Sequence, residues 1–77
     1  MHEGLIVGHW YKHYKGGVYF VRGVATHTET HEKLVVYCRV GDPDVNYARP
    51  LSMWFDEVGV DENGQPITRF RRDDDGK

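Results

Sequence analysis

Apolar and polar residues alternate most clearly between residues 9 and 49, and this period of two predicts a series of short β-strands. Residues 18–25 form the strongest of them, because β-branched and aromatic side chains fill both faces of that segment. The strands that alternation predicts in this half are residues 9–14, 18–25, 34–40 and 45–49. Since neighbouring short strands usually pair as hairpins, we expect these four to form an antiparallel meander.

Residues that favour turns separate the predicted strands. Gly16-Gly17 accepts positive φ, as a two-residue hairpin turn requires. Residues 26–33 are polar and hold neither Gly nor Pro, which predicts a longer loop. Gly41-Asp42-Pro43-Asp44 predicts a tight turn, and Pro50 should end the last strand because proline has no N–H for the ladder.

The pattern changes after Pro50. Leu51, Trp54 and Phe55 are spaced as i, i+3 and i+4, which predicts one helical turn with its apolar side against the sheet. Farther on, Asn63-Gly64 is a strong hairpin signal. The two strands flanking that turn are predicted at residues 57–60 and 65–70.

The predicted fold is all-β: a small, partly open SH3-like barrel of five to six short antiparallel strands with one helical turn near Leu51–Phe55. Within residues 34–40 we expect Leu34, Val36, Cys38 and Val40 to face the core, and Tyr37 and Arg39 to share the other face. The alternative is a more open, curved sheet that closes by pairing with a second chain, since short exposed edges favour association.

The domain limits follow from the same pattern. Residues 1–8 are expected to be a leader or an edge strand, residues 9–70 a single β domain, and residues 71–77, which hold no apolar side chain, a disordered tail. The chain has 77 residues, so a domain of this size has little core to spare for a deep enzyme pocket. Neither a membrane-spanning run nor a signal peptide is recognisable, and a cytoplasmic location is expected by default.

Charge and cysteine content narrow the function further. Residues 1–55 carry six basic and five acidic side chains, and residues 56–77 carry four basic and seven acidic ones. Neither part is basic enough to bind duplex DNA through phosphate neutralisation. Cys38 is the only cysteine, so no disulfide forms within the chain, and its place in an alternating run favours a small core residue over a nucleophile.

Several motifs occur in fixed order between residues 9 and 70. They are Tyr11-Lys12-His13-Tyr14-Lys15-Gly16, Tyr19, Gly23-Val24-Ala25, His27-Thr28-Glu29-Thr30, Leu34-Val35-Val36-Tyr37, Arg49-Pro50-Leu51 with Met53, and Arg69-Phe70. In this order and spacing the chain resembles a bacterial and phage family known as domain of unknown function 1653. Trp54 and the loop at residues 42–44 depart from the family pattern. The resemblance implies a small, mostly β, stand-alone cytoplasmic domain without assigned catalytic residues.

Metal and catalytic chemistry find little support in the sequence. His27 and His31 are four residues apart, as are His9 and His13, but in strands and loops this spacing separates the side chains by roughly 13 Å. No Gly-x-Ser-x-Gly elbow or phosphate-binding loop occurs, Cys38 is expected on the core side, and the hydroxyls of Ser52 and Thr26 have no base at a suitable spacing. We therefore expect a protein that is not an enzyme and that has no metal or other cofactor.

The remaining signal is a set of aromatic and polar cationic side chains on predicted strands and loops. The candidate ligand-binding residues are Tyr14, Lys15, His27, Thr30, Tyr37, Arg39, Tyr47 and Arg49. If the strands are neighbours, Tyr37, Arg39, Tyr47 and Arg49 align across them, with rings that stack on bases and guanidinium groups that bind phosphate. The competing interpretation is that the tyrosines are half-buried wall residues and the arginines pair with Glu29, Glu32, Asp42 or Asp44.

These residues favour a small binding module for a phosphorylated or nucleotide-like ligand, which in a phage would act by sequestering a host signalling nucleotide. One domain is too small to enclose a nucleotide, so this hypothesis predicts a homo-oligomer with the pocket between chains. Two alternatives stay open: an SH3-like module that docks an extended peptide of a protein partner, and a single-stranded nucleic-acid binder with a steep salt dependence.

Overall fold

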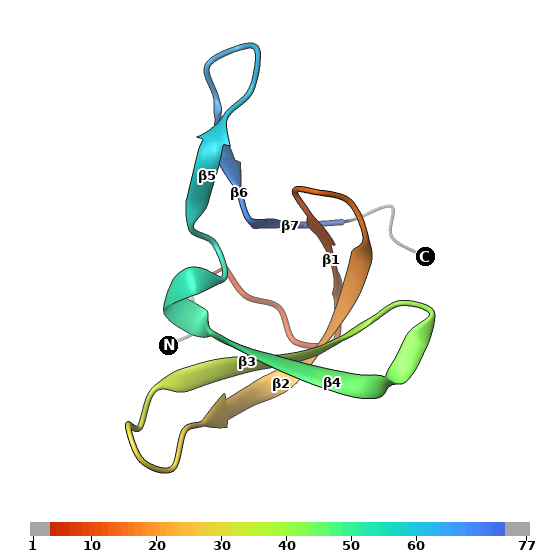
Figure 1. Ribbon diagram of the computed structural model, residues 1–77, viewed down its shortest axis with the longest axis vertical. Coiled ribbons are helices and arrows are strands. Elements are labelled where there is room, and N and C mark those ends of the chain that lie inside the picture. The colour runs from red at the N-terminus through yellow and green to blue at the C-terminus, as the bar shows by residue number, and fades with distance from the viewer. Residues whose placement is uncertain (1–3, 74–77) are drawn as a thin grey trace.

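Five strands form one antiparallel sheet in the order β4-β3-β2-β1-β7, and two more form a separate hairpin, β5-β6 (Figure 1). The computed structural model describes residues 4–73. Its elements are β1 (Trp10–His13), β2 (Val18–Thr26), β3 (Lys33–Arg39), β4 (Asp42–Pro50), the 3-10 turn η1 (Leu51–Met53), β5 (Glu57–Val60), β6 (Pro66–Thr68) and β7 (Phe70–Arg72). The all-β prediction and the helical turn are confirmed, with seven strands among the described residues.

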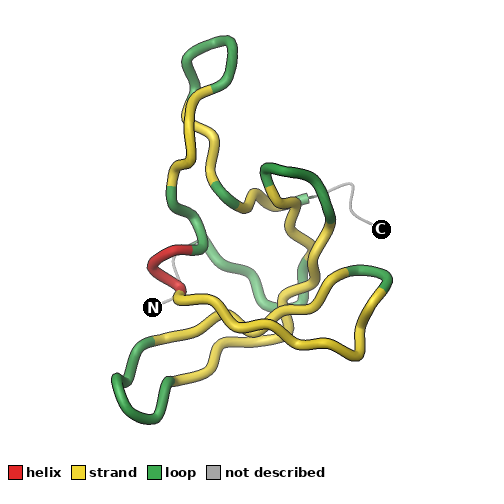
Figure 2. Tube along the Cα trace, viewed as in Figure 1, coloured by secondary structure: helices red, strands yellow, loops and turns green. Residues whose placement is uncertain are grey.

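The first four strands form the predicted meander. Tight turns join β1 to β2 and β3 to β4, and a longer loop joins β2 to β3, as Figure 2 shows in green. The sheet does not close into a barrel, because β4 and β7 are its two edges. The sheet is thus open, and its closure by pairing with a second chain stays a prediction.

The C-terminal end of the sheet extends farther than the sequence suggested. In β7, Arg71 pairs with Lys12 and Arg72 with Tyr11, so the prediction of a disordered tail from residue 71 is wrong for these two residues. Backbone hydrogen bonding to the neighbouring strand orders them although they carry no apolar side chain. Residues 74–77 lie outside the described residues.

The N-terminal segment packs against the sheet without forming an assigned strand. Leu5 is buried in the core. The Tyr11 hydroxyl donates to the Gly4 carbonyl at 3.2 Å and accepts from the Ile6 N–H at 3.0 Å, which fixes this segment over β1. Residues 1–3 lie outside the described residues.

The turn before β4 is shorter than predicted. Only Val40 and Gly41 separate the two strands, and Asp42 already pairs with Arg39. The next matched pair is Cys38 with Asn46, so residues 43–45 bulge out of the ladder. Pro43 is tolerated there because β4 is an edge strand, where a missing N–H leaves no neighbouring strand unpaired.

The predicted core face of residues 34–40 is wrong. Val35 and Tyr37 are the core residues of β3, whereas Val40 is 39% exposed. The cause lies after β4: the chain folds back so that Trp54 and Phe70 cover the face that carries Tyr37. Cys38 is buried on the opposite face.

The core cluster is largely aromatic. Trp54 follows η1, is fully buried, and stacks on Phe70 with ring centroids 3.9 Å apart and planes 3° from parallel. Leu51 and Phe55 pack against the same cluster, as the i, i+3, i+4 spacing predicted. The buried members are Leu5, Tyr11, Val21, Val35, Tyr37, Trp54 and Phe70.

The β5-β6 hairpin extends away from the sheet, at the top of Figure 1. Asp61 closes its loop, because its carboxylate accepts the backbone N–H groups of Asn63 and Gln65, each at 2.9 Å. Within residues 4–73 no helix has the length and apolar character needed to cross a membrane.

Candidate functional site

One face of the five-stranded sheet collects most of the aromatic rings, and we call it the inner face. Strand register explains the gathering, because residues directly opposite in an antiparallel pair point to the same side. Tyr37 is opposite Tyr47, and His13 is opposite Phe70. The inner face is formed by His13, Tyr19, Tyr37, Arg39, Tyr47, Arg49 and Phe70. The predicted alignment of Tyr37, Arg39, Tyr47 and Arg49 is therefore present.

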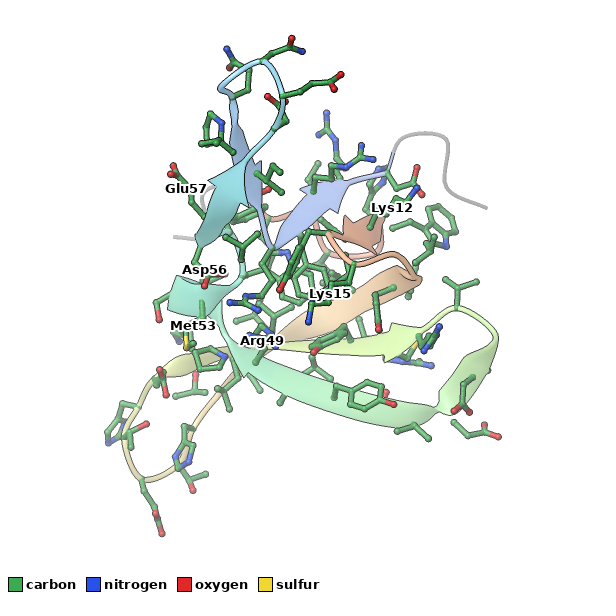
Figure 3. The ribbon with its side chains drawn as sticks, turned by 45° about the horizontal axis from the view of Figure 1, so that its top comes forward. Lys12, Lys15, Arg49, Met53, Asp56 and Glu57 are labelled. Carbon is green, nitrogen blue, oxygen red and sulfur yellow. The ribbon has the colours of Figure 1, made fainter. Side chains whose placement is uncertain are left out.

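Four basic side chains lie around the rings of Tyr14 and Phe70, and we call them the cationic cluster: His13, Lys15, Arg49 and Arg69. The Arg49 guanidinium lies 5.9 Å from the Phe70 ring centre. Lys15 and Arg69 lie 5.7 and 5.8 Å from the centre of the Tyr14 ring. Figure 3 shows the side chains of Lys15 and Arg49 on one side of the sheet, with Asp56 nearby.

Asp56 is the carboxylate that faces this cluster, and Arg69 already binds it. The Arg69 guanidinium donates to both Asp56 carboxylate oxygens, at 2.9 and 3.0 Å. These hydrogen bonds are the main reason that the pKa of Asp56 lies below its usual value, with the charge of Arg49 adding a smaller effect. One carboxylate thus serves several cations, and the cluster keeps an excess of positive charge.

Arg49 has no carboxylate partner among residues 4–73 and is half-buried. Its Nε is buried and donates no hydrogen bond within that part of the chain. A buried donor without an acceptor is costly and uncommon in native proteins.

The pKa of His13 lies below its usual value of 6.5, first because the ring is partly desolvated and then because Arg69, Arg49 and Lys15 repel a further positive charge. Its Nδ1 accepts the Lys15 backbone N–H at 3.1 Å, which orients the ring. At neutral pH His13 is therefore the uncharged member of the cluster.

This shift predicts a pH effect on stability. The unfolded chain binds a proton at His13 at a higher pH than the folded chain does, so the free energy of unfolding should fall as the pH drops from neutral through 6.5. Urea unfolding at neutral and mildly acidic pH would measure the loss, and His13→Gln should reduce it. An NMR titration that places the His13 pKa above 6.5 would contradict the conclusion that folding lowers this pKa.

A second aromatic and cationic pair adjoins the cluster, because the Tyr19 ring lies 6.3 Å from the His13 ring and 5.7 Å from the Phe70 ring. The Arg39 guanidinium is 6.0 Å from the centre of the Tyr19 ring, which is opposite Arg39 in the register. Gly17 lies against the same pair: a Cβ built there would be 3.3 Å from Tyr19 Cε1 and 3.8 Å from Arg39 Nη2. No ion pair joins Arg39 to Asp42, although the two are paired in the described ladder.

Two of the sequence-predicted residues lie away from this face. His27 and Thr30 are in the loop between β2 and β3, at the far end of that hairpin from Tyr19 and Arg39 (Figure 1, lower left). They serve the loop itself: His27 Nδ1 accepts the N–H groups of Glu29 and Thr30, and Thr30 Oγ1 accepts that of Glu32. Tyr37 is on the inner face but only 8% exposed, so it supports Tyr47 and leaves little of its own ring for a ligand.

The structure also adds residues that the sequence interpretation missed, namely His13, Tyr19, Arg69 and Phe70. The weak alternation of residues 9–14 already put His13 on the same side as Tyr11, and β1 opposite β2 extends that side to Tyr19. The pairing of β7 with β1 had no local signal.

The middle of the inner face, with Tyr37 and Phe70, is buried in the core beneath Trp54, whereas Arg39 and Tyr47 are exposed at its border; residues 4–73 enclose no pocket. Within that range no three His, Cys, Asp or Glu side chains gather as metal ligands would. The face can therefore offer ring stacking and cationic hydrogen-bond donors to an anion, from one side.

Comparison with known proteins agrees with this architecture. The family model DUF1653, described as a protein of unknown function, matches residues 9–72. A crystal structure of a DUF1653 protein from Bordetella bronchiseptica is similar, with a TM-score of 0.72 and 34% sequence identity over 91% of this chain and 88% of that one. No curated protein sequence matches.

Proposed function

This chain belongs to the DUF1653 family, and we propose that it is a non-enzymatic binding module for a phosphorylated, nucleotide-like small ligand held on the inner face. The role is proposed for the cytoplasm, since the lone cysteine suits a reducing compartment. Binding without turnover would sequester the ligand.

The observation that carries the proposal is the state of Arg49. Its guanidinium lies over Phe70, has no carboxylate partner in the described chain, and keeps a buried Nε without an acceptor. A phosphate accepts two parallel hydrogen bonds from a guanidinium, which makes it a well-matched partner for such a group. Lys15 stands close enough to add a second charge.

The aromatic residues support the nucleotide part of the proposal. Tyr14 is 41% exposed and lies beside Lys15 and Arg69 of the cationic cluster. Tyr47 is 42% exposed and lies in β4, the strand that carries Arg49. Every base has a π-face, so exposed tyrosines bind bases with little regard to sequence. Rings next to guanidinium groups can therefore hold the base and the phosphate of one ligand together.

An open face buries only part of a small ligand, whereas small-molecule sites usually bury most of it. We therefore propose that a second copy completes the site. The exposed edge strand β4, which carries Tyr47 and Arg49, is the place where another chain would pair. Native mass spectrometry should then find dimers or larger assemblies, and any co-purified ligand with them.

Calorimetric titration tests the function. Adenosine monophosphate and inorganic phosphate are titrated into the wild type, Arg49→Gln and Arg71→Gln. Arg71 lies in β7 opposite Lys12, on the outer side of the sheet, so its replacement changes the net charge equally while leaving the inner face intact. We expect Arg49→Gln to weaken the binding of adenosine monophosphate at least tenfold, because a charge-assisted hydrogen bond is lost. Arg71→Gln should bind adenosine monophosphate as tightly as the wild type does.

Equal weakening in both variants, or no binding by the wild type across a panel of common nucleotides, would remove the proposal. The alternatives give other results. An extended peptide partner would be captured without dependence on Arg49, and a single-stranded nucleic-acid binder would prefer oligothymidylate and lose affinity steeply with salt.

A further inference from the structure

We propose that the β5-β6 hairpin is an arm that binds the outer face of the sheet in a second copy of this chain. The arm is residues 57–68, and the outer face is the side of the five-stranded sheet opposite the aromatic core. This contact is separate from the pairing at β4, and it does not rest on the proposed ligand. The arm and the outer face complement each other in apolar surface and in charge.

The arm projects from the sheet as a hairpin that is fixed at both ends (Figure 1). At its base, the Arg69 guanidinium binds both carboxylate oxygens of Asp56, and the Arg69 backbone N–H donates to the Asp56 carbonyl at 2.8 Å. At its tip, the Asp61 carboxylate accepts two backbone N–H groups. A two-stranded hairpin that stands alone is marginally stable in water, so a further layer packed on the arm would stabilise it.

The arm carries apolar side chains that its own chain leaves uncovered. Val60 is 66% exposed, more than any other large hydrophobic side chain within residues 4–73. Its cross-strand partner Pro66 is also exposed. Residues 57–68 hold three acidic side chains and no basic one, namely Glu57, Asp61 and Glu62. The arm is thus an acidic hairpin with an exposed apolar pair.

The outer face has an apolar surface of its own. Tyr11 is fully buried in the core, so its neighbours in β1, Trp10 and Lys12, point to the other side of the sheet. The Trp10 ring centre lies 5.4 Å from that of Phe20, its partner in β2. Both rings are only half-buried, so they offer the arm an apolar surface to pack on.

The outer face also carries uncompensated positive charge beside these rings. Lys12 and Arg71 are directly opposite each other in the β1-β7 ladder, and both are exposed. Neither forms an ion pair within the described part of the chain, not even with Asp73, which follows β7. Like charges at opposed positions of a sheet are destabilising. An acidic partner at this position would relieve the repulsion.

The arm of the same chain does not reach this face. It leads away from the sheet in Figure 1, and Figure 3 shows Glu57 and Lys12 on opposite sides of the molecule. In the arm of a second copy, the apolar pair packs on the two rings and the acidic side chains lie beside the two cations. Under two-fold symmetry each copy gives one arm and one face, so the contact forms twice and the buried area doubles.

Charge reversal on each side tests this contact. One variant, Glu57→Lys with Glu62→Lys, makes the arm basic, and the other, Lys12→Glu with Arg71→Glu, makes the outer face acidic. Asp61 is kept because it closes the loop. Each variant alone sets like charges together, so native mass spectrometry should find smaller assemblies than in the wild type, with association weakened at least about tenfold. An equimolar mixture pairs each reversed side with its complement and should restore assemblies that contain both variants.

Val60→Ser tests the apolar part of the contact, and Val7→Ser is its matched control. Val7 is 49% exposed and lies in the segment before β1, so its replacement removes a similar apolar side chain outside the arm and the outer face. Val60→Ser should weaken the association at least about fivefold, because the valine would be buried between copies. Val7→Ser should associate as the wild type does, and circular dichroism checks that every variant keeps its fold.

Assembly that each reversed variant loses and the mixture recovers supports the arm contact. A monomeric wild type, reversed variants that assemble as the wild type does, or a mixture that stays apart would overturn it. Capture of a basic peptide by the arm in place of a second copy would overturn it as well. The reversed variants leave the inner face unchanged, so failure of the arm contact leaves adenosine monophosphate binding in place. A wild type that binds no nucleotide leaves the arm contact standing.

Discussion

Replacing Trp54 by alanine should cost about 3–5 kcal/mol in the free energy of unfolding, the range for a large buried aromatic side chain. Trp54 is fully buried, stacks on Phe70, and makes edge contacts with the rings of Tyr11 and Tyr37. A domain of 77 residues has roughly 4–12 kcal/mol of stability in all. Urea unfolding followed by circular dichroism should therefore show that Trp54→Ala loses a large part of the total stability, with a much lower unfolding midpoint than the wild type.

Trp54→Phe provides the matched control. The indole Nε1 of Trp54 donates no hydrogen bond within residues 4–73. A phenyl ring therefore leaves no polar partner unsatisfied and keeps the stack on Phe70. The expected cost is about 1–2 kcal/mol, from the lost volume alone. Equal destabilisation by the two substitutions would contradict the view that ring stacking at this position holds the core together.

Gly17→Val should destabilise the fold by about 2–4 kcal/mol. Gly17 has a φ of +88°, which a β-branched residue adopts only with strain. Its added Cβ would also stand 3.3 Å from the Tyr19 ring, tighter than ordinary contact. The ring must shift, and Arg39 with it, so the variant should also lose any ligand that depends on Arg39.

Gly16 separates these two effects. Its φ is +101°, but a Cβ there meets no atom within 4 Å. Gly16→Val should therefore cost only the backbone strain, about 1–2 kcal/mol. Thermal or urea unfolding of both variants gives the difference, and a Gly16→Val variant as unstable as Gly17→Val would show that Tyr19 yields to the new side chain without cost.

The strands and turns were predictable because alternation, glycine pairs and the Asn-Gly signal act locally. The core face of β3 was not, because residues 34–40 are apolar on both sides. Which side is buried depends on Trp54 and Phe70. Trp54 is brought to the sheet by the turn after β4 and Phe70 by the pairing of β7 with β1, and both are distant from residues 34–40 in the sequence. The bulge between Val21 and Gly23 in β2 also breaks the period of two that a sequence pattern assumes.

The residues of the candidate site were likewise predictable where the pattern is local and not where distant segments pair. Tyr37, Arg39, Tyr47 and Arg49 could be placed on one face from parity within two adjacent strands. His27 could not be excluded by sequence, since only the loop geometry shows its Nδ1 occupied by backbone donors. The cationic cluster depends on β7, whose polar end gave no sign that it pairs with β1.

The pairing of β7 with β1 has a consequence for how the protein folds. Each of the other ladders joins segments that are close in sequence, whereas His13 and Phe70 are brought together from opposite ends of the chain. Closing so long a loop costs entropy before any contact offsets it. Substitutions in β7 should then leave the folding rate almost unchanged and speed unfolding, because this ladder forms after the rate-limiting step. Arg69, the member of the cationic cluster that directly precedes β7, would accordingly be the last to join the cluster and the first to leave it.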